Sequence, residues 1–118
     1  MQKIGIRVSE APGLTTIELT GELDLETCPP VAEVTDAFQL RGRTLCIDLS
    51  EVTFMGSTFL NLLLRLRQRA EVEEGTLELT GLQHQAERVL ALTGARPLFR
   101  IRPCVPPVPS IRLVGSDG

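Results

Sequence analysis

The sequence predicts a small α/β domain on a mixed sheet of about five strands, with an antiparallel N-terminal edge, largely parallel strands beyond it, and roughly three to four helices. Two observations lead to this class. The chain begins with two alternating runs joined by a turn, and it then alternates between helical and strand-like segments. Its 118 residues match the length of one domain and are enough to bury a core without cross-links.

Alternation of apolar and polar residues predicts the first two strands. Ile4, Ile6 and Val8 fall on one face of an extended chain, and a second alternating run covers residues 16–20. The connection at residues 11–13, Ala-Pro-Gly, has turn chemistry, because proline presets φ and glycine supplies a positive φ. Two strands joined so closely indicate an antiparallel hairpin.

A helix and a buried strand follow the hairpin. Apolar residues recur at helical spacing from Val31 to Phe38, with two prolines before Val31 that suit a first turn and Gly42 just past the end. Residues 44–49 are almost continuously apolar, which predicts a strand covered on both faces, as in a parallel sheet.

The second helix is predicted from Ser57 to about Glu73 and is ended by Gly75. Ser57 is expected to be its N-cap, with a hydroxyl that accepts a backbone hydrogen bond. Leu60 and Leu64 lie on a different flank from the core stripe, so they either pack against a neighbouring element or form a docking surface. The core stripe itself consists of Phe59, Leu62, Leu63, Leu66 and Ala70.

The C-terminal part of the predicted domain adds two strands and a helix. Residues 76–80 alternate as a strand does, and a third helix with Ala86 and Leu90 on its buried face ends at Gly94. Residues 98–102 predict a short strand at an edge of the sheet.

A change of composition divides the chain into a domain at residues 1–102 and a tail rich in proline and glycine at residues 103–118. The tail is expected to stay extended or to run over the surface. Within it, residues 111–114 are apolar enough to dock as an extra strand, and residues 106–109 suit a spacer or a short polyproline ligand.

Composition and charge exclude several classes of function. Twelve basic and fifteen acidic residues leave a net charge of −3, and Trp and Tyr are absent, so the chain offers no basic stripe or aromatic platform for nucleic acid. One histidine and three widely spaced cysteines predict neither a metal site nor a cofactor, and Cys46 is expected in the core. Because no apolar run is long enough for a membrane span or a secretory leader, a cytoplasmic protein is expected.

The sequence also lacks the common catalytic patterns. Ser57 lies between a strand and a helix, but Met55 and Phe59 occupy the two positions where a nucleophile elbow requires glycine. The single histidine, His84, has polar neighbours and is expected on the surface, which leaves the serine without a base. An enzyme is therefore not expected.

Three segments carry a family resemblance. Residues 47–60 read Ile-Asp-Leu-Ser-Glu-Val-Thr-Phe-Met-Gly-Ser-Thr-Phe-Leu, residues 19–24 read Leu-Thr-Gly-Glu-Leu-Asp, and residues 90–94 read Leu-Ala-Leu-Thr-Gly, with Leu98-Phe99 after them. In this order and spacing they resemble the STAS domain family, above all the bacterial anti-sigma factor antagonists. The resemblance covers about residues 3–102 and implies the mixed sheet with helices that the periodicity also predicts.

The resemblance implies regulation of transcription by binding, without catalysis. Members of this family bind an anti-sigma factor that is also a serine kinase of the histidine-kinase-like ATPase type, and this binding frees a sigma factor. The kinase then phosphorylates a serine at the start of the second helix and ends the interaction. On this chain the resemblance places the acceptor at Ser57, with Thr58 as the weaker choice. The residues it implies in partner binding are Glu22, Asp24, Gly56, Ser57, Thr58, Phe59, Leu60 and Leu64.

The chain departs from the family pattern at two positions next to the acceptor. Gly56 stands where the family has Asp, and Phe59 stands where it has Gly. The Phe59 ring either turns inward along the core stripe or becomes part of a remodelled interface. The departures leave open an alternative function, a STAS scaffold or ligand-binding domain that is never phosphorylated.

Overall fold

The structure is a computed structural model that describes residues 4–102. The expectations for the tail, including its docking strand and polyproline segment, lie outside these residues. The described elements are β1 (Ile4–Ala11), β2 (Leu14–Leu23), α1 (Cys28–Asp36), β3 (Thr44–Met55), α2 (Ser57–Glu73), β4 (Thr76–Thr80), α3 (His84–Leu92), the 3-10 turn η1 (Arg96–Leu98) and β5 (Arg100–Arg102).

The mixed α/β fold predicted from the sequence is confirmed, with differences at several element ends. The hairpin, α2 and β4 lie where the periodicity placed them. Both β2 and β3 are longer than their apolar runs, and α1 ends at Asp36, two residues short of Phe38. The last strand begins only at Arg100, because the chain before it forms the 3-10 turn η1.

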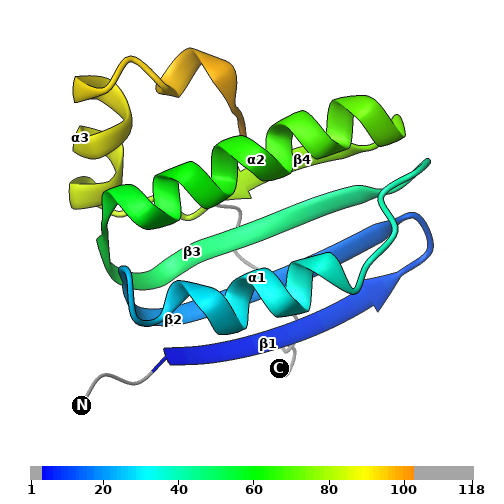
Figure 1. Ribbon diagram of the computed structural model, residues 1–118, viewed down its shortest axis with the longest axis horizontal. Helices are drawn as coiled ribbons and strands as arrows, with labels where there is room; N and C mark the ends of the chain where they lie inside the picture. The colour runs from blue at the N-terminus through cyan, green and yellow to red at the C-terminus, as the bar shows by residue number, and fades with distance from the viewer. Residues whose placement is uncertain (1–3, 103–118) are drawn as a thin grey trace, which may run out of the picture.

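The strands follow one another across the sheet in chain order, β1 to β5, with β1 antiparallel and the others parallel. Right-handed crossovers that always step in the same direction place every connecting helix on the same face. Figure 1 shows α1 and α2 side by side in front of the sheet. The expectation that β3 is covered on both faces holds in part: within residues 4–102 helices cover one face only, but Cys46 on the other face is also buried.

Cys46 is buried even though its side chain belongs to the face without helices. Its register partners on the neighbouring strands are Thr16 and Glu78, and Glu78 forms an ion pair with Arg102 at 3.3 Å. Only 3% of Cys46 is exposed, which confirms the expected core position. Burial raises the pKa of the Cys46 thiol, so at neutral pH this cysteine is protonated and a poor nucleophile.

The main core lies between the sheet and the two long helices. All five residues of the predicted α2 stripe are buried, and Phe59 is the largest side chain that is completely enclosed. Leu60 is also buried, and Leu64 packs against the core while remaining partly exposed. The ring of Phe59 has thus turned inward along the core stripe and is not part of a surface interface.

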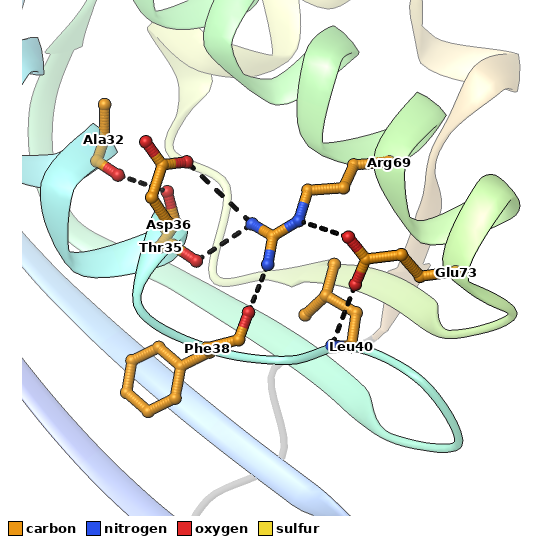
Figure 2. Close-up of polar contacts among 7 residues, drawn as sticks. All are labelled: Ala32, Thr35, Asp36, Phe38, Leu40, Arg69 and Glu73. Carbon is orange, nitrogen blue, oxygen red and sulfur yellow. Dashed lines mark hydrogen bonds and ion pairs between the residues drawn. The ribbon is translucent and has the colours of Figure 1, made fainter.

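An arginine on α2 clamps the chain that leads from α1 to β3 (Figure 2). The Arg69 guanidinium donates hydrogen bonds to the Thr35 carbonyl at 2.9 Å, to the Phe38 carbonyl, and to the Glu73 carboxylate at 2.9 Å. Glu73 in turn accepts a hydrogen bond from the Leu40 N–H at 3.1 Å. Because α1 has no basic residue in its last turn, Arg69 supplies the positive charge that its carbonyl end attracts.

We expect Phe59→Ala to lower the free energy of unfolding by about 3–5 kcal/mol, because it leaves a cavity under α2 that the sheet cannot close. Urea denaturation followed by circular dichroism measures this loss. Val72→Ala is the control, since Val72 is 77% exposed on the same helix and its truncation should change stability by less than about 0.5 kcal/mol. Equal losses for the two variants would place the Phe59 ring outside the core.

The clamp predicts a dependence of stability on pH. The hydrogen bond from Arg69, and next that from the Leu40 N–H, hold the pKa of Glu73 below its ordinary value of 4.5. A carboxylate whose pKa is lower in the folded state stabilises the fold above the unfolded pKa, and this contribution is lost as the pH falls through the folded pKa. Glu73→Gln should therefore be less stable than wild type at neutral pH, with a difference that shrinks below pH 4.5.

Urea denaturation of both proteins across this pH range measures the difference. Glu71→Gln serves as the control for removing one charge from the same helix, because the exposed Glu71 forms an ion pair only with Arg67, at 3.3 Å, among the described residues. If the deficit of Glu73→Gln stayed constant with pH, the carboxylate charge would have no part in the clamp.

Candidate functional site

The candidate site lies where two parallel strands end at the same edge of the sheet. Leu23, the last residue of β2, is in register with Met55, the last residue of β3. The N–H of Gly56 donates a hydrogen bond to the Leu23 carbonyl at 2.8 Å. This pairing brings the corner after β2, with Asp24, next to the start of α2, with Ser57. The structure thus gathers most of the residues that the resemblance implied.

Ser57 is exposed at the first position of α2, and the residue that caps the helix is Gly56. The expectation that Ser57 is the N-cap is therefore wrong. Gly56 has extended backbone angles and its carbonyl accepts the first helical hydrogen bond, from the Leu60 N–H at 3.1 Å. Since glycine has no side-chain oxygen, no side chain caps this helix. The amide groups of the first turn remain available to an anion at the positive end of the helix dipole.

Asp24 uses one carboxylate oxygen to hold the turn that leads into α1. Its Oδ1 accepts hydrogen bonds from the N–H groups of Glu26 at 3.1 Å and Thr27 at 3.3 Å. The buried Thr27 hydroxyl donates to the Glu22 carbonyl at 2.6 Å, which closes the same turn. Asp24 thus has a structural role in addition to its place on the rim beside Ser57.

The neighbourhood of Gly56 is shaped by the ring of Phe54. A Cβ at position 56 would lie 3.3 Å from Phe54 Cε2, 3.4 Å from the Leu23 carbonyl oxygen and 3.6 Å from the Cα of Asp24. The φ of −91° at Gly56 suits any residue, so backbone strain does not explain the glycine. The aromatic ring explains it better, because a larger side chain here would have to displace the ring by a few tenths of an ångström.

Two of the apolar residues implied in docking lie inside the molecule. Phe59 is 0% exposed and Leu60 is 7% exposed, so neither presents a surface to a partner, and Leu64 is half-buried beside them. The broad apolar character of α2 is explained by packing on the sheet. These residues belong to the core, or pack against it, beneath the start of α2.

The exposed apolar side chains near Ser57 are ones that the sequence analysis missed. Leu25 follows Asp24 and is 73% exposed, while Phe54 touches the Gly56 position and is 42% exposed. The exposure of Leu25 could have been predicted from the sequence, since a leucine in the corner after a strand lies outside the apolar pattern that faces the core. The exposure of Phe54 could not, because β3 carries register shifts against β2 and the alternation of its side chains is lost.

The rim around Ser57 is acidic and carries no metal cluster. Glu22 and Glu26 are exposed beside Asp24. No group of three potential ligands is close enough to hold a metal ion anywhere in residues 4–102. His84 is exposed at the start of α3, as expected. The arrangement suits binding of a protein and acceptance of a phosphoryl group by an exposed hydroxyl.

None of the helices described by the structure is both long and apolar enough to span a membrane.

Comparisons with known proteins agree with this geometry. The family profile described as "Mlab, STAS domain" matches residues 6–100. The anti-sigma-B factor antagonist of Listeria monocytogenes is 32% identical over 73% of this chain and 76% of its own length. The solved structure of an anti-sigma factor antagonist from Mycobacterium paratuberculosis superposes with a TM-score of 0.73 at 26% identity, covering 87% of this chain and 88% of that one.

SpoIIAA shares the fold at lower identity. The anti-sigma factor antagonist SpoIIAA in its unphosphorylated form gives a TM-score of 0.71 at 17% identity, over 86% of this chain and 89% of that one. A phosphorylated form of SpoIIAA from Bacillus gives 0.65 at 18% identity, over 86% and 92%. With the family profile matching nearly the whole described domain, and with its five-stranded mixed sheet backed by helices on one face, this chain belongs to the STAS domain family.

Proposed function

We propose that this protein is an anti-sigma factor antagonist, which binds an anti-sigma factor and thereby releases a sigma factor. The partner we propose is an anti-sigma factor that is also a serine kinase of the histidine-kinase-like ATPase type. The protein itself acts by binding and catalyses no reaction. The observation that carries the proposal is the exposed Ser57 at the uncapped start of α2, on a rim with exposed apolar side chains.

The docking surface consists of an apolar pair and the polar rim around it. The pair is Leu25, in the corner after β2, and Phe54, next to the last residue of β3, and both side chains are exposed. Exposed side chains of this kind are typical anchors of protein interfaces, and a polar rim surrounds such anchors. The rim residues are Glu22, Asp24, Gly56, Ser57 and Thr58. Phe59 and Leu60 drop out of the surface because they are buried, whereas Leu64, which is partly exposed, stays in the proposed surface.

Phosphorylation of Ser57 would end the interaction without disturbing the fold. A phosphate adds about −1.5 to −2 charges at neutral pH. The first turn of α2 tolerates this anion, because its amide groups have no side-chain cap and the helix dipole favours negative charge there. A partner that covers Phe54 and Ser57 together would have to desolvate the phosphate, which is far more costly than desolvating a hydroxyl.

One of the two departures from the family pattern presents no obstacle to a kinase. Phe59 lies in the core, so its ring leaves the approach to Ser57 open. The other departure, Gly56, removes a carboxylate next to the acceptor. This loss is the observation that supports the alternative function, a STAS scaffold or ligand-binding domain with a degenerate switch.

Incubation with ATP and an anti-sigma factor kinase from the same genome should add one phosphate to the wild-type protein and none to Ser57→Ala, as measured by intact mass. Thr58→Ala should accept the phosphate as wild type does. The phosphorylated protein should bind the kinase at least about tenfold more weakly, a difference of about 1.4 kcal/mol.

Two results would contradict the switch at Ser57. One is a mass gain that persists in Ser57→Ala. The other is a wild-type protein that binds the partner but gains no mass in the presence of ATP, together with equal affinities of wild type and Ser57→Glu for that partner. This second result would favour the scaffold that is never phosphorylated.

Leu25→Ser and Phe54→Ser should each weaken binding of the anti-sigma factor by about tenfold or more, because each removes an apolar anchor from the interface. Titration calorimetry with the anti-sigma factor measures the affinity. Leu92→Ser is the matched control, since Leu92 on α3 is 78% exposed but lies on a different element. If Leu92→Ser weakened binding as much as Leu25→Ser, the docking surface would lie elsewhere.

A further inference from the structure

The last part of β3 has no strand neighbour on one of its two sides. Pairing between β3 and β4 stops at Asp48, whereas pairing between β3 and β2 continues to Met55. The chain leaves β4 at Gly81, which has a φ of +73° and lies so close to Ser50 that a Cβ there would be 2.7 Å from its backbone nitrogen. From Ser50 onward, the backbone groups on this side of β3 need other partners.

Two glutamine side chains from the start of α3 take the place of the missing strand. Gln83 donates a hydrogen bond from its side-chain amide to the Ser50 carbonyl. Gln85 makes two contacts with a single residue: its Oε1 accepts from the Met55 N–H at 2.7 Å, and its Nε2 donates to the Met55 carbonyl at 3.1 Å. Both hydrogen bonds of Gln85 are partly buried, which makes them costly to lose.

An open pocket of about 410 Å³ lies beside the contact between the start of α3 and this part of β3, and it is lined by residues 50–53 and 83–85. Figure 1 shows α3 at the end of the molecule where α2 begins. Beside this opening, the hydrogen bonds from α3 to β3 help to fix the position of the β3 backbone.

Met55 is the residue from which α2 starts. Its side chain is buried, Gly56 follows it as the cap of the helix, and Ser57 comes next. The Gly56 N–H is held by the Leu23 carbonyl on the β2 side, and Gln85 holds Met55 on the α3 side. The turn that presents Ser57 is therefore anchored from both sides, on one side by backbone and on the other by a single side chain.

We propose that Gln85 is a positioning residue for the Ser57 site, which couples α3 to the first turn of α2. The functional effect of this coupling rests on the proposed function, since the position of Ser57 matters only if an anti-sigma factor kinase binds and phosphorylates it. Glutamine is suited to this role because its amide presents one donor and one acceptor to the N–H and the carbonyl of the same residue, as a neighbouring strand does. Any shift of α3 is passed through Gln85 to Met55 and so to the acceptor serine.

Amide hydrogen exchange on the isolated full-length chain tests the coupling directly. Gln85→Met should speed exchange at Met55 and at Leu60, whose N–H makes the first bond of α2, by about two- to tenfold. Gln85→Glu keeps an acceptor for the Met55 N–H but loses the donor to its carbonyl, so its effect should be smaller. The charge control is Gln68→Glu on the exposed face of α2, which should leave both amides unchanged.

Phosphorylation kinetics test the consequence. Gln85→Met should lower kcat/KM for transfer of phosphate to Ser57 by about ten- to a hundredfold, as misplacement of a reacting group does. Arg69→Gln is the control for a general loss of stability, because it weakens the opposite end of α2, where Arg69 holds Thr35 and Phe38. Arg69→Gln should leave this kinetic constant within about twofold of wild type, a change below 0.5 kcal/mol.

The two measurements separate failure of this inference from failure of the proposed function. Unchanged exchange at Met55 and Leu60 in Gln85→Met would overturn the inference, and so would equal kinetic losses in Gln85→Met and Arg69→Gln. If the wild-type chain neither binds nor accepts phosphate from the kinase, the proposed function fails, and the exchange result alone decides whether Gln85 positions the start of α2.

Discussion

The structure depends on the pairing of β2 with β3, which continues to the last residue of each strand. This pairing brings Leu23 into register with Met55 and fixes the Gly56 N–H on the Leu23 carbonyl. Two segments far apart in the chain are thereby joined at one edge of the sheet, the Asp24 corner and the start of α2. The pair carries two register shifts, and β3 continues along β2 past the point at which β4 leaves it.

The burial of Phe59 explains one of the two departures from the family pattern near Ser57 as a core contact. A glycine at this position, as the family pattern has, contributes no core contact, whereas Phe59 fills the largest enclosed position under α2. At Gly56 the relation is reversed, because the exposed Phe54 ring occupies space next to a position without a side chain. The site therefore has no carboxylate at position 56 and an exposed aromatic ring beside it.

The helices and strands were predictable because each follows from a local pattern of apolar residues. The face of the sheet that the helices cover was not predictable in this way. Alternation found the hairpin and β4, and the stripe from Phe59 to Ala70 found α2 with both its ends. The apolar run at residues 44–49 indicated cover on both faces, but strand order decides this, and no local pattern records that the strands follow one another in chain order. The position of the candidate site in the chain was predictable, but the side chains exposed around it were not. The resemblance implied Ser57 and Asp24, which the structure places close together, whereas the exposure of Phe54 depends on a register shift and the proposed role of Gln85 on a contact across 30 residues.

The two ends of α2 are held by different means, and this difference is what makes a local switch physically reasonable. At its C-terminal end, Arg69 and Glu73 bind backbone groups of the α1–β3 connection with charged hydrogen bonds, which are about twice as strong as neutral ones. At its N-terminal end the helix has a glycine cap, no capping side chain, and neutral hydrogen bonds to Leu23 and Gln85. The proposed phosphate at Ser57 would act on the end that no charged side chain holds, while the clamp keeps the rest of the helix on the sheet. The surface presented to the proposed partner would then change, and the core with Phe59 would not have to.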